Sequence, residues 1–99
     1  MSSSPESATL EKVKLTTPSF WTVVLHNDDY TPMDFVVFIL NVVFHLDLDS
    51  ANEIMLKVHN EGKAPIGKYT KEIALSKANQ VIKMAEDLEH PLQATAEKV

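Results

Sequence analysis

The chain has 99 residues, the size of a single domain, and a formal net charge of −5. With 44% hydrophobic and 23% charged residues, its composition is close to that of globular proteins, so we expect it to fold. The absence of cysteine excludes a disulfide framework and a thiolate metal site, and the acidic balance argues against a nucleic-acid partner, because phosphate contacts need clustered basic residues.

The N-terminal residues 1–18 differ from the rest of the chain in composition. They are rich in Ser, Thr and Pro and hold only isolated apolar residues, too few to repay the entropy of ordering. We therefore predict a flexible N-terminal extension over 1–18 and a folded domain over 19–99. The extension is interpreted either as a loose end or as a segment that engages one partner while the domain holds another.

No targeting or membrane segment is expected. The start of the chain lacks the basic and apolar regions of a secretory signal. The longest apolar run, from Phe35 to Leu40, is far shorter than the roughly 20 residues that cross a bilayer. These observations predict a cytoplasmic protein with no membrane partner.

A strand and a turn are predicted after the extension. Apolar Trp21, Val23 and Leu25 alternate with the residues between them, which is typical of a half-buried strand. The run Asn27-Asp28-Asp29-Tyr30 interrupts this pattern, because Asn and Asp side chains bond to nearby backbone and favour turns.

A helix is predicted to begin at Thr31-Pro32-Met33-Asp34, with Thr as N-cap and Pro at the first helical position. We expect it to continue to about His45 or Leu46. Phe38 lies in the middle of the polar stripe of this helix. The apolar face of the helix comprises Val36, Ile39, Leu40 and Val43.

A second helix is predicted from Ala51 to about Asn60. Asp49 or Ser50 is expected to cap its N-terminus, and Gly62 its C-terminus.

The C-terminal part is predicted as strand, helix and strand. Residues 64–69 form a short strand, in which Pro65 indicates an edge position. Thr70 caps a helix whose apolar stripe comprises Ala74, Ala78, Val81, Ala85 and Leu88. His90-Pro91 ends this helix, and alternation over residues 92–97 indicates a last strand. The order β-α-α-β-α-β predicts a small α+β domain, with a three-stranded antiparallel sheet and three helices packed on one face.

The turn residues Asn27, Asp28 and Asp29 are candidates for ligand binding. Two carboxylates and an amide follow a strand and precede a helix, and their spare acceptor oxygens suit a cation or an ammonium group. Ordinary turn and cap chemistry is the alternative interpretation of the same residues, and this stretch alone does not decide between them.

An apolar pocket beside these acceptors is a second hypothesis. Met33 and Val36 lie at the start of the first helix, and Met55 and Val58 lie near the end of the second. If the two helices are neighbours, these four residues enclose a pocket with His59 at its mouth. Plain core packing is the alternative, and periodicity does not separate the two.

Enzymatic chemistry has little support in the sequence. The histidines show no metal-ligand spacing, nucleotide-binding motifs are absent, and neither a metal nor a cofactor is expected. An acid–base pair of Asp28 or Asp29 with His59 is conceivable, but the sequence identifies no nucleophile for it.

Three motifs together resemble a known family. They are Asn27-Asp28-Asp29-Tyr30-Thr31-Pro32-Met33, then Met55-Leu56 and Val58-His59 followed by Glu61-Gly62-Lys63, and finally Glu89-His90-Pro91-Leu92. Their order and spacing, between Trp21 and Val99, resemble those of the ClpS family of adaptors in the bacterial and plastid N-degron pathway.

The resemblance implies a non-enzymatic adaptor in the bacterial cytoplasm, which we expect to be a monomer. Such a protein binds substrates whose first residue is Leu, Phe, Tyr or Trp, and hands them to the ClpA unfoldase of the ClpAP protease. The residues implied to hold the substrate's α-ammonium and first peptide group are Asn27, Asp28, Asp29 and His59. Those implied to form the side-chain pocket are Thr31, Met33, Val36, Met55, Val58 and Leu92.

The resemblance also assigns roles in selectivity and delivery. Met33 is implied to be a gatekeeper that disfavours β-branched first residues. Glu72 and Lys77 match positions of the family's docking surface for the unfoldase, and residues 1–18 take the place of an extension needed for delivery.

Phe38 and His26 depart from the family pattern, which often has a polar residue at the first position and an apolar residue at the second. Neither is a matched pocket position.

Two other functions are alternatives: a module that docks the unfoldase without recognising N-termini, and a small hydrolase that uses Asp29 and His59. The order of preference among large first residues is left open.

Overall fold

The computed structural model describes residues 19–99, so the extension predicted over 1–18 lies outside the described residues. The elements are β1 (Trp21–His26), α2 (Met33–Val42), α3 (Leu48–Glu61), β2 (Lys63–Tyr69), α4 (Lys71–Asp87) and β3 (Gln93–Lys98). This order confirms the predicted α+β fold.

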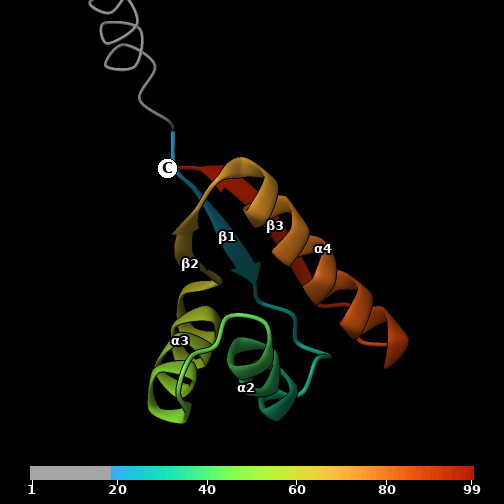
Figure 1. Cartoon of the computed structure of the whole chain (residues 1–99). Coiled ribbons are helices and arrows are strands. Elements are labelled where there is room, and N and C mark those ends of the chain that lie inside the picture. Colours follow the sequence, from blue (N-terminus) through green and yellow to red (C-terminus); the bar gives the residue numbers. More distant parts are fainter. Residues whose placement is uncertain (1–18) are drawn as a thin grey trace, which may run out of the picture.

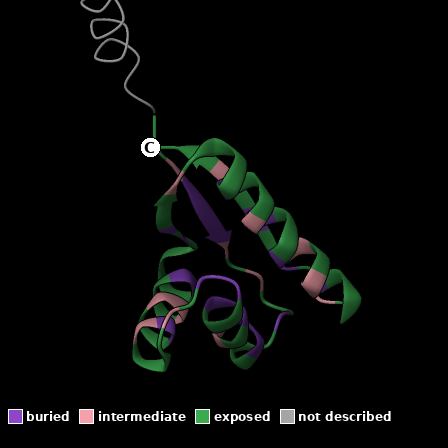
Figure 2. Cartoon of the chain, in the orientation of Figure 1, coloured by how far each residue is buried: buried purple, intermediate pink, exposed green. Residues whose placement is uncertain are grey.

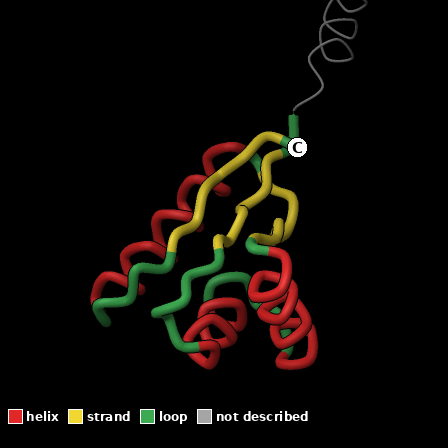
Figure 3. Tube along the Cα trace, turned by 180° about the vertical axis from the view of Figure 1, so that it is seen from behind, coloured by secondary structure: helices red, strands yellow, loops and turns green. Residues whose placement is uncertain are grey.

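The three strands form one antiparallel sheet with β1 in the middle, in the order β2-β1-β3. Leu25 of β1 pairs with Ala64 on one side and with Ala94 on the other. Pro65 therefore lies in an edge strand, as predicted, where a missing N–H costs no ladder hydrogen bond. Figure 3 shows the sheet from behind, with α4 on its far side.

One helix covers a face of this sheet, and the other two lie at its end. α4 crosses its face and packs on β1 and β3, whereas α2 and α3 pack against each other beyond the end of β1 (Figure 1). Buried residues concentrate where these layers meet (Figure 2). The largest fully buried side chains are Leu25, Ile39, Leu40, Leu92, Val23, Val43 and Val81. None of the helices in residues 19–99 is both long and apolar enough to span a membrane.

The central strand is more deeply buried than predicted. A half-buried strand should expose Thr22 and Val24, yet both are buried along with Val23 and Leu25. β1 has a neighbouring strand on each side, and the Thr22 hydroxyl donates a hydrogen bond to the Ile66 carbonyl (3.2 Å). The central place of β1, with a strand along each edge, thus accompanies burial of residues on both of its faces.

The two N-terminal helices begin or end at residues other than those predicted. α2 ends at Val42 rather than at His45 or Leu46, because His45 takes a left-handed backbone conformation (φ 59°) and turns the chain. α3 begins at Leu48 with Asp47 as its N-cap, so the prediction of Asp49 or Ser50 was wrong. The Asp47 side chain accepts a hydrogen bond from the Ser50 N–H (2.7 Å).

The prediction of Thr31 as N-cap of α2 was wrong: the helix begins at Met33 with Pro32 at the cap position, and the Thr31 hydroxyl donates to Asp28 instead. Two other predicted caps are confirmed. Gly62 ends α3 with φ 91°, and Thr70 caps α4 by accepting from the Ile73 N–H. The apolar stripe of α4 is buried except for its last predicted member. Leu88 is exposed, because the helix ends at Asp87 and the backbone leaves the helical path there.

Candidate functional site

The loop between β1 and α2 is organised around the carboxylate of Asp28. Its Oδ2 accepts hydrogen bonds from the backbone N–H of Tyr30 (3.1 Å) and from both the N–H and the hydroxyl of Thr31 (2.7 Å each). A short Asp side chain reaches backbone groups two and three residues ahead, which is why Asp favours such turns. Three donors hold this carboxylate in one orientation, and among the described residues its Oδ1 accepts no hydrogen bond.

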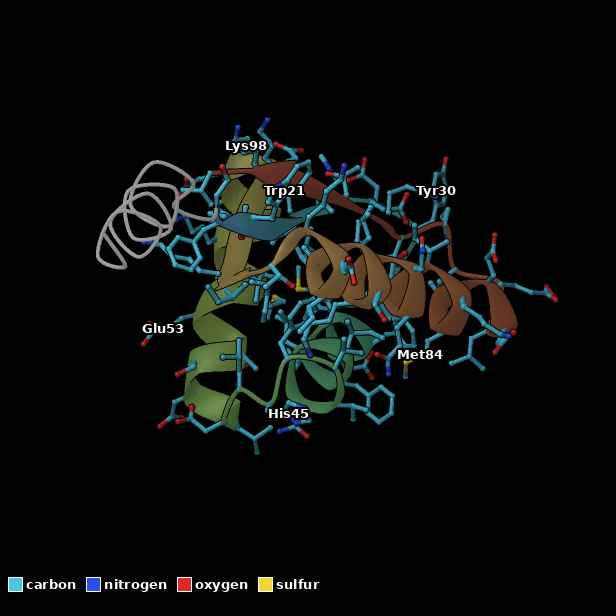
Figure 4. All side chains as sticks on the ribbon, turned by 45° about the horizontal axis from the view of Figure 1, so that its top comes forward. Trp21, Tyr30, His45, Glu53, Met84 and Lys98 are labelled. Atoms are coloured by element: carbon cyan, nitrogen blue, oxygen red, sulfur yellow. The ribbon has the colours of Figure 1, made fainter. Side chains whose placement is uncertain are left out.

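Asn27 and Asp29 flank this carboxylate with further polar groups. The Asn27 N–H donates to the Gly62 carbonyl (2.8 Å) and ties the loop to the junction of α3 and β2. The Asn27 amide lies 3.5 Å from Asp29 Oδ1, and both side chains are exposed. Tyr30, by contrast, projects into solvent with 85% of its surface exposed (Figure 4).

The two N-terminal helices supply apolar side chains beside this loop. Met33, the first residue of α2, is 46% exposed, whereas Val36, one turn further on, is buried. Met55 of α3 is partly buried, and Val58, one turn further on, is buried. Because α2 and α3 pack against each other, these four residues border a common space.

Two more residues come from segments next to the strands. His59 lies in the last turn of α3, beside Val58, and its side chain is exposed. Leu92 directly precedes β3 and is buried.

A single cavity of about 140 Å³ connects these groups. Its buried lining is apolar apart from Thr31, and its exposed lining is polar apart from Met33. The complete lining is Asn27, Asp28, Asp29, Thr31, Met33, Val36, Met55, Val58, His59 and Leu92. These are the same ten residues to which the resemblance assigns ligand binding. The structure brings all ten together, and the role of each in binding stays a prediction.

This arrangement suits recognition better than catalysis. Carboxylate and amide oxygens beside an apolar hollow can accept hydrogen bonds from an ammonium group while the hollow takes an attached side chain. An acid–base pair needs its members within hydrogen-bond reach. Among the described residues, no hydrogen bond or ion pair joins Asp29 to His59. The same part of the chain holds no cluster of three metal-ligating side chains.

The two residues predicted to dock an unfoldase lie on α4, and neither lines the cavity. Glu72 is exposed. Lys77 is half-buried: its Nζ donates to the Val43 carbonyl at the end of α2 (2.8 Å) and lies 5.7 Å and 5.5 Å from the ring centroids of Phe44 and Tyr69. Lys77 thus has contacts inside the domain. Burial raises the pKa of Tyr69, whose ring lies beside Lys77.

One contact near the cavity is not predicted by any sequence pattern. The ring of His90, a residue predicted to end a helix and part of the motif Glu89-His90-Pro91-Leu92, packs on the ring of Phe35. The contact joins two segments far apart in the sequence, so no local pattern predicts it.

Comparison with known proteins places this geometry in a family. Residues 16–95 match the family model described as ATP-dependent Clp protease adaptor protein ClpS. The chain belongs to the ClpS family. Members of this family are adaptors of the Clp protease, so a Clp protease is the partner that membership implies.

Individual relatives agree with the family assignment. The chain is 54% identical over 98 residues to the ATP-dependent Clp protease adapter protein ClpS of Vibrio atlanticus (strain LGP32), a match that covers 97% of this chain and 92% of that protein. It is 50% identical over 97 residues to the protein of the same name from Vibrio cholerae (strain O395), covering 96% of this chain and 92% of the relative.

A solved structure shares the fold. The structure of Agrobacterium tumefaciens ClpS2 bound to L-phenylalaninamide superposes with a TM-score of 0.81 at 33% sequence identity. The match covers 83% of this chain and 99% of that chain. The resemblance stated from the motifs is therefore confirmed.

Proposed function

We propose that this ClpS-family adaptor binds the first residue of substrates that begin with Leu, Phe, Tyr or Trp, and delivers them to the ClpA unfoldase of the ClpAP protease. Only the first residue of a chain offers a free α-ammonium next to its side chain. A cavity with acceptors at its rim and an apolar interior recognises both groups at once, and this combination is the observation that carries the proposal.

The polar residues at the rim bind different groups of the substrate's N-terminus. Asp28 Oδ1 accepts a hydrogen bond from the α-ammonium, because Oδ2 is already occupied by Tyr30 and Thr31. Asn27, Asp29 and His59 bind the remaining ammonium protons and the first peptide group. Charge-assisted hydrogen bonds of this kind contribute about 1.5–3 kcal/mol each.

The apolar residues receive the first side chain. A cavity of about 150 Å³ in another protein holds one benzene molecule, and the cavity here is about 140 Å³. A phenyl ring or a leucine side chain therefore fits better than the fused rings of tryptophan. Burial of such a side chain is worth about 1.5–3 kcal/mol. After the cost of association, binding near −8 kcal/mol, a micromolar dissociation constant, is expected.

The ligand of the Agrobacterium relative supports the same substrate class. L-Phenylalaninamide carries a free α-amino group and an aromatic side chain, and its amide stands in for the peptide bond to a second residue. Delivery to the unfoldase is proposed through the exposed Glu72 on α4, with the family's adaptor role as its support.

Calorimetry with three peptides tests the proposal. A Phe-initiated peptide should bind with micromolar affinity. Its Ala-initiated twin leaves the cavity unfilled, and its N-acetylated twin lacks the positive charge, so both should bind at least about tenfold more weakly. Equal affinity for all three peptides would contradict recognition of N-termini and would favour the alternative of a docking module.

A further inference from the structure

The chain leaves α4 through a defined C-terminal motif. The His90 N–H donates to the Ala85 carbonyl (2.8 Å), and the Glu89 N–H donates to the Glu86 carbonyl (2.9 Å). Glu89 has a left-handed backbone conformation (φ 59°). This pair of hydrogen bonds around a left-handed residue is the Schellman motif. It sets the direction of the chain after α4, and hence the place of His90.

The ring of His90 then contacts α2. Its centroid lies 4.7 Å from that of Phe35, and the two planes are inclined by 58°, a distance and a tilt that favourable aromatic pairs adopt. Phe35 is buried and His90 is partly buried. The contact joins α2 to the loop between α4 and β3.

Both joined segments supply walls of the cavity. Val36 directly follows Phe35, and Leu92 lies two residues after His90; both line the cavity. α2 packs mainly against α3, so the aromatic contact is a specific tie between α2 and the loop that carries Leu92. Loss of this tie would let the two walls separate and loosen the fit around a ligand side chain.

We propose that His90 is a positioning residue for first-residue selectivity. Through Phe35 it holds Leu92 against the apolar wall, although it does not line the cavity itself. The proposal rests on the proposed function, because it specifies which residues outside the cavity determine how tightly a large side chain is held. The polar rim comes from the β1–α2 loop and α3, and neither Phe35 nor His90 lines the cavity.

Three variants test this proposal with the full-length protein. His90→Ala removes the ring, His90→Phe restores an aromatic partner for Phe35, and Leu88→Ala alters an exposed residue of the same loop as the matched control. The affinity for a Phe-initiated peptide should fall about fivefold to tenfold in His90→Ala and return to within about twofold of wild type in His90→Phe. Leu88→Ala should bind as wild type does.

The Ala-initiated peptide separates positioning from general damage. It uses the rim but leaves the cavity unfilled, so its weak affinity should be the same in all variants, and only the ratio between the two peptides should change. Thermal unfolding checks that each variant is folded; if His90→Ala is not, His90→Gln replaces it.

An unchanged ratio in the folded variant, or a loss in His90→Ala that His90→Phe does not restore, would overturn the positioning role. Failure of the wild-type protein to prefer the Phe-initiated peptide would instead contradict the proposed function itself.

Discussion

The negative charge of Asp28 can be removed without removing the hydrogen bonds that its side chain makes within the turn. Removing its side chain would free the donors of Tyr30 and Thr31 and disturb the loop. Asp28→Asn keeps an oxygen that accepts from these donors, but it removes the negative charge and presents N–H donors to the α-ammonium. We predict that calorimetry will show an affinity for a Phe-initiated peptide that is about tenfold to hundredfold lower.

The control for this prediction is the melting temperature of Asp28→Asn, which should stay close to that of the wild type because the turn is kept. A variant that is stable and still binds with wild-type affinity would remove Asp28 from the proposed ammonium site.

Met33 stands at the mouth of the cavity, and its size is predicted to limit which side chains enter. It is 46% exposed, so Met33→Ala should cost little stability. The wider mouth should admit side chains branched at Cβ. We predict a gain of about tenfold in affinity for an Ile-initiated peptide, since about two buried methylene groups are worth this much. Competition binding against a fluorescent Phe-initiated peptide measures it, and an unchanged Ile affinity would argue against a gatekeeper.

The sequence alone identified the polar groups of the cavity more securely than its apolar lining. Asn27 and Asp28 stand in a turn motif whose acceptors had to be near the surface. For Met55 and Val58, periodicity indicates only that a side chain faces inward, and whether the interior there is filled or hollow depends on the packing of α2 against α3. The resemblance to ClpS implied a hollow at this place, and the structure has a cavity there.

At the scale of the helices, the cap of α3 makes a pH-dependent contribution. The hydrogen bond from the Ser50 N–H lowers the pKa of Asp47 below its ordinary value of 3.8. A carboxylate with a lowered pKa in the folded state stabilises the fold above its ordinary pKa, and this contribution is lost as the pH falls through the lowered value. The charged carboxylate therefore stabilises the cap at neutral pH, and this part of its contribution is lost in acid.

Asp47→Ala tests this contribution. We predict a lower melting temperature than wild type at pH 7, by a few degrees, and a difference that shrinks as the pH is lowered past 3.8. Differential scanning calorimetry across this range measures it. Asp47→Asn is the control, because Asn caps helices as well as Asp does without titrating. If the melting temperatures of wild type and Asp47→Ala differ by the same amount at every pH, the charge of Asp47 does not contribute to the cap.

Lys77 ties α4 to the end of α2, and this complicates its predicted role in docking. Replacing it with Met should lower the free energy of unfolding by about 1–2 kcal/mol, because the hydrogen bond to the Val43 carbonyl and the contacts with two aromatic rings are lost. Urea unfolding with an unchanged m-value measures the loss. Glu72→Gln changes an exposed side chain and should leave stability unchanged, so only this variant reports on docking alone.

The ends of the elements show which signals are local. Thr70 and Gly62 act as caps because a cap depends on the nearest few residues. His45 and Glu89 take left-handed conformations without being Gly, and nothing in the local sequence marks them. The apolar pattern therefore extends past the true ends of α2 and α4, and both helices were predicted to reach residues that the structure leaves outside them.

At the scale of the whole molecule, the sheet topology assembles the cavity. His26 at the end of β1 pairs with Lys63 at the start of β2 and with Gln93 at the start of β3. Asn27, Gly62 and Leu92, which adjoin these three residues in the sequence, therefore come together at one end of the sheet. Because the cavity exists only when β1, α2, α3 and β3 are all in place, a ligand that fills it binds the folded state alone.

Ligand binding should consequently stabilise the entire domain. A ligand at about 100 times its dissociation constant adds about 2.7 kcal/mol, and for a domain of this size about 1 kcal/mol corresponds to 4–8 °C in melting temperature. We predict that saturating L-phenylalaninamide raises the melting temperature by roughly 10–20 °C.

Two matched compounds separate the two halves of the site in the same thermal-shift experiment. N-Acetyl-L-phenylalaninamide keeps the ring and removes the positive charge, and L-alaninamide keeps the charge and leaves the cavity empty. Each should shift the transition by a few degrees at most, because neither satisfies both the acceptors around Asp28 and the apolar walls. A shift by the acetylated compound equal to that of L-phenylalaninamide would mean that the apolar hollow binds aromatic rings without recognising a chain's N-terminus, and the rim would then have no part in selection.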